Sequence, residues 1–91
     1  MRGLLGRKEL PSGEGILLRP SGSVHTFFMR FPIDVVFLDR ELRVVAIAAH
    51  VPPWRMRGAR GAKVVLELAA GEASRQGLSE GQTLLLSEPP K

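Results

Sequence analysis

Short runs of apolar residues, most of them closed by glycine or proline, recur along the whole chain. Apolar runs of about four to eight residues with such boundaries are typical of β-strands. β-Branched residues favour a strand over 43–50, and the prolines at positions 52 and 53 end it. The pattern predicts strands over residues 15–19, 25–31, 33–38, 43–50, 62–68 and 82–87, and a loop over 54–61.

Helix signals are confined to two short segments. A single helical turn is predicted around Leu4 and Leu5, and a short helix over residues 71–76. In the second segment Glu72 and Arg75 suit the two ends of the helix dipole, and the glycine that follows can adopt a left-handed closing conformation. The expected fold is mainly β, of the α+β class: a small antiparallel barrel-like or curled sheet of about six strands with one or two short helices.

The chain of 91 residues is long enough for one domain and too short for two, so residues 1–91 are taken as a single domain. Its apolar runs are shorter than the roughly 18 to 20 residues that a membrane-spanning helix needs. Charged residues at 7–9 also interrupt the amino terminus too early for a secretory signal. We therefore expect a cytoplasmic protein that does not associate with a membrane.

Composition narrows the chemistry further. The chain contains no cysteine, which excludes disulfides, thiolate metal sites and cysteine nucleophiles. It also contains no asparagine and has ten arginines against three lysines, a composition resembling that of thermophilic proteins. The net charge of +4, from 13 basic and 9 acidic residues, favours anionic partners.

Four of the basic residues fall between positions 55 and 63, directly after Trp54 and without an intervening acid. An exposed aromatic ring beside several cations can stack on a base or another planar group while the cations hold an anion. A small β-barrel is also a common platform for single-stranded nucleic acid. Nucleic-acid binding is therefore one alternative for this segment, and a solvated loop capping the barrel is the other.

Ionisable residues also occur inside apolar runs, where an unpaired charge is costly to bury. His25, Arg30 and Asp34 lie in the run over 25–39, and Glu67 lies in the run over 62–68. If strand alternation continues past the proline at position 32, Arg30 and Asp34 point the same way and form either a structural ion pair or a polar anchor for a ligand. Glu67 is expected to be solvated or paired with a cation unless it faces the same cavity as Asp34.

Several segments occur in an order that resembles one uncharacterised prokaryotic family, known as domain of unknown function 192. The resemblance implies a small, mostly β, barrel-like domain with one or two short helices, and it implies no established activity. The chain departs from the commoner pattern of that family at Phe28 and Gln82, where many relatives have Trp and Asp. The matching segments are His-Thr-Phe-Phe-Met-Arg-Phe-Pro-Ile-Asp at 25–34, Val-Phe-Leu-Asp at 36–39, Pro-Trp-Arg at 53–55, Leu-Glu at 66–67 and Ala-Gly at 70–71.

These observations favour a binding or accessory module rather than an enzyme. We expect it to recognise a small polar or anionic ligand or a protein segment at the mouth of the barrel. No catalytic residue, cofactor or metal is assigned, because the two histidines are far apart and no phosphate-binding glycine motif is present. The predicted ligand-binding residues are His25, Arg30, Asp34, Trp54, Arg55 and Glu67.

Two alternatives lead to different geometries. A small hydrolase or lyase would use Asp34 and Glu67 as acid and base with His25 assisting, and its carboxyl groups would lie about 5 to 10 Å apart across a cleft. A single-stranded nucleic-acid binder would instead lose affinity steeply as the salt concentration rises.

Overall fold

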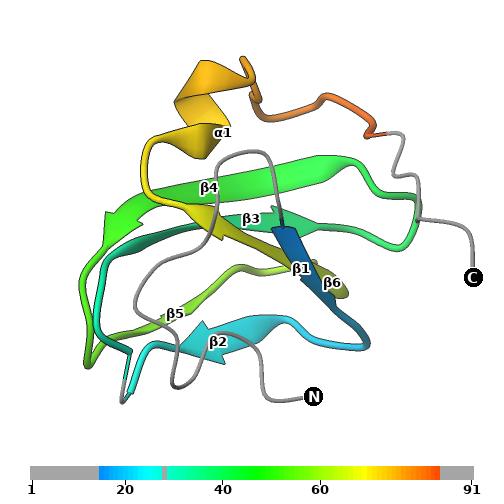
Figure 1. Cartoon of the computed structure of the whole chain (residues 1–91). Helices are drawn as coiled ribbons and strands as arrows, with labels where there is room; N and C mark the ends of the chain where they lie inside the picture. The colour runs from blue at the N-terminus through cyan, green and yellow to red at the C-terminus, as the bar shows by residue number, and fades with distance from the viewer. Residues whose placement is uncertain (1–14, 28, 85–91) are drawn as a thin grey trace, which may run out of the picture.

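The computed structural model describes residues 15–27 and 29–84. These residues form two antiparallel sheets and one short helix, joined by turns and loops (Figure 1). The larger sheet contains four strands in the order β1 (Gly15–Leu18), β6 (Val64–Ala69), β3 (Ile33–Leu38) and β4 (Val44–Val51). The smaller sheet pairs β2 (Ser23–His25) with β5 (Met56–Gly58), and α1 covers Glu72–Arg75. The predicted mainly β class is confirmed, and within the described residues the strands form two separate sheets that do not close into a barrel.

Most predicted elements lie within one or two residues of the observed ones, and β3 has the predicted bounds. The strand predicted over 25–31 is wrong after its first residue, because the chain turns at Thr26, whose carbonyl accepts a hydrogen bond from the amide of Met29. The predicted loop over 54–61 contains β5. The predicted turn at Leu4 and Leu5 and the second half of the strand predicted at 82–87 lie outside the described residues. In the first half, Thr83 forms a β-bridge with Arg43.

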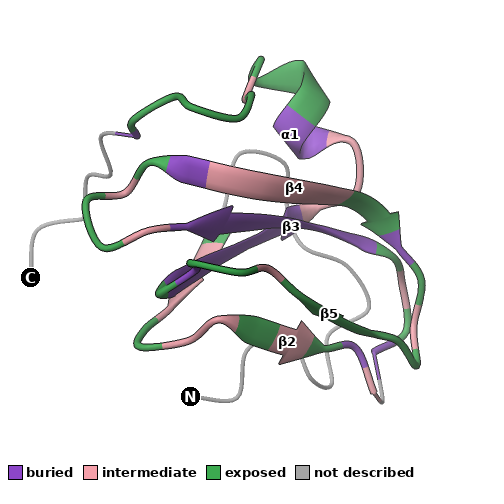
Figure 2. Cartoon of the chain, turned by 180° about the vertical axis from the view of Figure 1, so that it is seen from behind, coloured by how far each residue is buried: buried purple, intermediate pink, exposed green. Residues whose placement is uncertain are grey.

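Both faces of the larger sheet are covered, which explains why β3 and most of β6 read as continuous buried runs (Figure 2). The face toward β2 and β5 forms the inter-sheet core, whose buried members are Met29, Ile33, Val35, Phe37, Val51, Ala62 and Val65. The opposite face, under α1, forms the helix-side core, whose buried members are Val36, Leu38, Val44, Val64, Leu66, Leu68, Ala73 and Leu84. Among the described residues, no helix is long and apolar enough to cross a membrane.

Candidate functional site

Asp34 is fully buried and faces the helix-side core, because it alternates along β3 with Val35 of the inter-sheet face. One carboxylate oxygen accepts a hydrogen bond from the amide of His50 at 2.9 Å. The other accepts from the amides of Gly71 at 3.0 Å and Ala73 at 2.9 Å. Three backbone donors satisfy a buried carboxylate well. Asp34 therefore ties the end of β4 to the start of α1.

The local backbone is shaped to make this contact. The β3–β4 ladder shifts register between Ile33 and Val35, and His50 has a positive φ of 53°. A register shift of this kind leaves a backbone amide outside the strand ladder. Here the amide of His50 donates instead to the side chain of Asp34. The polar residue in this apolar run is thus explained by the fold itself.

Arg30 does not form the expected ion pair with Asp34. It lies exposed in the turn before β3, whereas Asp34 is inaccessible to solvent. The pairing is not needed, because three amides already bond to the carboxylate. The predicted shared site of Arg30 and Asp34 is therefore corrected to a solvated arginine and a structural aspartate.

Thr26 plays a similar structural role at the end of β2. It is 1% exposed, and its hydroxyl donates to the carbonyl of Pro52 at 2.7 Å and accepts from the amide of Arg55 at 2.8 Å. Its backbone amide donates to the carbonyl of Arg55, and its carbonyl accepts from the amide of Trp54. Thr26 therefore holds the loop in which Trp54 adopts a positive φ of 66°.

An aromatic surface lies beside this loop. The rings of Phe27 and Trp54 are stacked, with centroids 5.6 Å apart and planes at 27°. His25 lies against Phe27 at 5.0 Å and is directly opposite Met56 in the β2–β5 ladder. Trp54 and Met56 are 55% and 65% exposed, unusual values for large apolar side chains. Together with Arg55, these four residues define what we call the Trp54 surface.

Arginines precede and follow Met56: Arg55 belongs to the Trp54 surface, whereas Arg57 is directly opposite Val24, on the other face of the β2–β5 ladder. Arg55 and Arg57 are exposed, and each guanidinium donates to the carbonyl of the preceding residue. The structure thus brings together His25, Trp54 and Arg55 of the six predicted site residues. Phe27 and Met56 were not predicted, although the two-residue spacing of Phe27 from His25 was a usable signal.

Glu67 lies on the inter-sheet face of β6, directly paired with Ile16 of β1 and Val35 of β3. It is 4% exposed, and no described residue bonds to its buried Oε1 atom. Burial among apolar neighbours disfavours the charged form and raises the pKa of Glu67 from 4.5 to about 7. The expectation that Glu67 is solvated or bonded to a cation is therefore wrong.

The carboxyl groups of Asp34 and Glu67 project from opposite faces of the same sheet. Val35 lies opposite Glu67, and Asp34 lies opposite Leu68, so strand alternation sends the two acids in opposite directions. His25 belongs to the other sheet. The shared cleft that the hydrolase or lyase alternative requires is not formed by these residues.

Other catalytic arrangements also lack support in the described part of the chain. No group of three histidine, aspartate or glutamate side chains there could hold a metal ion. Gly77–Gly81 has the spacing Gly-x-Ser-x-Gly. A nucleophile elbow requires a strand that leads into a helix, whereas this segment follows α1. Ser79 is exposed there, and its amide donates to the side chain of Gln82.

Comparison with known proteins gives relatives that are themselves uncharacterised. The model of the DUF192 family, described as uncharacterized ACR, matches residues 1–86. A UPF0127 protein of Pyrococcus horikoshii is 47% identical over 38 residues, which make up 42% of this chain and 32% of that protein. The aligned stretch therefore spans only about a third of this curated relative.

Two solved structures have the same fold. A protein of unknown function from Novosphingobium aromaticivorans is 31% identical with a TM-score of 0.78, over 88% of this chain and 62% of that one. A Sinorhizobium meliloti protein, provisionally described as a transcription regulator, is 24% identical with a TM-score of 0.79, over 88% of this chain and 67% of that one. The second likeness shows the fold alone. Because the family model matches nearly the whole chain, the chain belongs to the DUF192 family of uncharacterised proteins.

Proposed function

We propose that this domain is a binding module that holds an acidic segment of a partner protein at the Trp54 surface. The observation that carries the proposal is the exposure of Trp54 and Met56 on either side of Arg55, where Thr26 fixes the loop that leads into β5. Aromatic residues, methionine and arginine are enriched in protein interfaces, and tryptophan and arginine often dominate their binding energy.

The openness of the Trp54 surface favours a protein segment over a small molecule. Small-molecule sites usually enclose most of their ligand in a cleft. Here the side chains of Trp54 and Met56 are more than half exposed, and β5 is exposed along its whole length (Figure 2). Such a surface suits a ligand that lies across it.

The short sheet beside the Trp54 surface offers a second means of attachment. Within the described residues β2 and β5 pair only with each other, so each has an unpaired edge. An extended peptide can add to such an edge through backbone hydrogen bonds while its side chains contact neighbouring residues. Acidic side chains of the peptide would then meet Arg55 and Arg57.

Charge supports the acidic character of the segment. The β2 and β5 strands and the loop before β5 carry two arginines and no carboxylate. Complementary charge raises the rate of association and suppresses unsuitable partners.

Single-stranded nucleic acid is the second candidate, favoured by the stacked rings of Phe27 and Trp54 next to cations. The two candidates differ in salt dependence. Binding to an oligonucleotide would weaken steeply with rising salt as counterions are released, whereas a peptide anchored by apolar contacts would be less sensitive.

A peptide-selection experiment tests the proposal. Peptides are selected from a random displayed library on the immobilised domain, synthesised, and measured by calorimetry against wild type and Trp54→Ala. We expect acidic peptides whose affinity falls by at least about 30-fold in Trp54→Ala, equivalent to about 2 kcal/mol.

Two charge variants sharpen this test. Arg55→Gln should weaken binding, whereas Arg43→Gln, which removes an equally exposed charge at the opposite end of β4, should not. Peptides that bind Trp54→Ala as tightly as wild type would contradict the proposal. An oligonucleotide that binds through Trp54 when no peptide does would reassign the surface to nucleic acid.

A further inference from the structure

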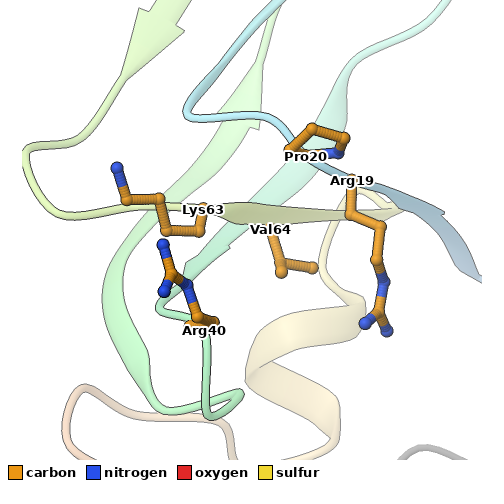
Figure 3. Close-up of a pocket in the computed structure, with 5 residues that line it drawn as sticks. All are labelled: Arg19, Pro20, Arg40, Lys63 and Val64. Carbon is orange, nitrogen blue, oxygen red and sulfur yellow. The ribbon is translucent and has the colours of Figure 1, made fainter.

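A cationic pocket lies at the opposite end of the larger sheet from the Trp54 surface. The Trp54 loop follows the end of β4, beside the start of β3, whereas this pocket lies where β1 and β3 end and β6 begins. Its volume is about 220 Å³, and its lining residues are Arg19, Pro20, Arg40, Lys63 and Val64. Figure 3 shows Lys63 and Arg40 on one side of Val64 and Arg19 on the other.

Backbone hydrogen bonds join the three segments that carry these cations. The amide of Lys63 donates to the carbonyl of Leu38 at 2.8 Å, and the carbonyl of Lys63 accepts from the amide of Ser21 at 2.9 Å. Arg40 is two residues beyond Leu38, and Arg19 is two residues before Ser21. The positions from which the cations project are therefore fixed by the fold, and only the side chains remain free to adjust.

A close backbone approach fixes the same junction. A Cβ atom built on Gly22 would lie 2.8 Å from the carbonyl oxygen of Ala62, a distance that real Cβ atoms essentially never show. Only glycine allows the chain after Ser21 to pass this close to the segment before Lys63. Replacing Gly22 would separate the segments that carry Arg19 and Lys63.

The lining of the pocket contains no acid to balance its charge. Asp39, which precedes Arg40, does not line the pocket, and its Oδ1 atom accepts hydrogen bonds from the amides of Glu41 and Arg43, both at 2.9 Å. Glu41 is exposed in the turn and does not line the pocket. A concave site lined by positive charges without balancing negative charges concentrates anions from solution.

We infer that this pocket binds the phosphoryl group of a small molecule that carries at least two negative charges. Arginine matches phosphate oxygens with paired N–H donors, and lysine adds a mobile point charge. Val64 and Pro20 supply an apolar floor on which the rest of such a molecule can lie. The site is independent of the Trp54 surface and of the function proposed for it.

Pyrophosphate is the probe that tests this inference, because it is small and multiply charged. We expect it to shift the backbone amide resonances of Arg19 and of residues 21–22, 38–41 and 62–64 in an NMR titration of the whole chain, with affinity that falls as salt is added. The double variant Arg40→Gln with Lys63→Gln should bind at least about tenfold more weakly, because charge-assisted hydrogen bonds are lost.

Two control variants make the result specific. Arg60→Gln removes an exposed charge three residues before Lys63 that does not line the pocket, and Trp54→Ala alters the other surface; neither should change pyrophosphate binding. The inference is overturned if the pocket amides do not shift, or if the double variant binds as well as wild type. It is equally overturned if Arg60→Gln weakens binding as much as the double variant, or if an oligonucleotide binds the pocket and pyrophosphate does not.

Discussion

Asp34 and Glu67 are buried acids on neighbouring strands of one sheet, yet their surroundings are opposite. Asp34 accepts three backbone hydrogen bonds on the helix side, whereas Glu67 faces the inter-sheet core with a buried oxygen that no described residue bonds. The carboxylate oxygens of Asp34 have backbone partners, whereas burial among apolar neighbours favours the protonated form of Glu67. The comparison teaches that a charged residue in an apolar run does not by itself mark a ligand site.

The largest expected effect is on the satisfied acid. Asp34→Ala should lower the free energy of unfolding by about 4 kcal/mol, because three backbone amides lose the carboxylate that accepts their hydrogen bonds. Asp34→Asn keeps one acceptor and should lose less. Urea denaturation followed by circular dichroism measures both variants.

Two controls separate this role from simple loss of charge. Asp39→Ala removes a carboxylate from a solvated turn, and Arg30→Gln removes the predicted but unformed partner of Asp34. Arg30→Gln should change stability by less than about 0.5 kcal/mol. A loss in Arg30→Gln comparable with that in Asp34→Ala would show that the two side chains are paired after all.

The unsatisfied acid should make stability depend on pH. The pKa of Glu67 is raised from 4.5 to about 7 in the folded protein, so the folded state binds more protons than the unfolded state between these values. Its contribution is therefore fully present below about pH 4.5 and is lost as the pH rises through about 7, a fall of up to about 3 kcal/mol.

The matched variant is Glu67→Gln, which keeps the shape and cannot ionise. Denaturant unfolding of both proteins at about pH 5 and about pH 8 isolates the contribution of Glu67, because every other titrating group is shared. We expect the free energy of unfolding of wild type to fall relative to that of Glu67→Gln as the pH rises from about 5 to about 8. A difference that is the same at both pH values would show that the buried carboxyl has an ordinary pKa.

A smaller effect is expected at Thr26, another buried polar residue whose hydrogen bonds are satisfied within the fold. Thr26→Val preserves shape but leaves the amide of Arg55 and the carbonyl of Pro52 without the hydroxyl, which should cost about 1 to 2 kcal/mol. Hydrogen exchange at the amides of Trp54 and Arg55 should also accelerate. Thr26→Ser keeps the hydroxyl and should retain protection; equal exchange in both variants would contradict the role assigned to Thr26.

The strands and the helix that were predicted correctly are those whose sequence pattern lies within the element itself. The apolar run at Ile33–Leu38 defines β3 because a strand covered on both faces needs no polar alternation. β5 was missed because Met56–Gly58 has no strand pattern of its own, and its extended form depends on pairing with β2. Tertiary context determines such segments.

The site was predicted less well, because contacts distant in sequence decide it. The donors at Gly71 and Ala73 lie 37 and 39 residues beyond Asp34, so local pattern could not indicate that the carboxylate was satisfied. The opposite orientations of Asp34 and Glu67 follow only from the register between β3 and β6. The grouping of His25, Trp54 and Arg55 could be predicted from the sequence more readily. Trp54 and Arg55 are adjacent, and His25 is two residues from Phe27.

We propose that the acidic partner segment binds at the exposed Trp54 surface and not at the buried Asp34 or Glu67. The most direct test is calorimetric affinity for one selected acidic peptide in three folded proteins: wild type, Trp54→Ala and Glu67→Gln. We expect Trp54→Ala to bind the peptide at least about 30-fold more weakly than wild type, and Glu67→Gln to bind it with wild-type affinity. Undiminished binding by Trp54→Ala, together with loss of binding by Glu67→Gln, would contradict the proposal.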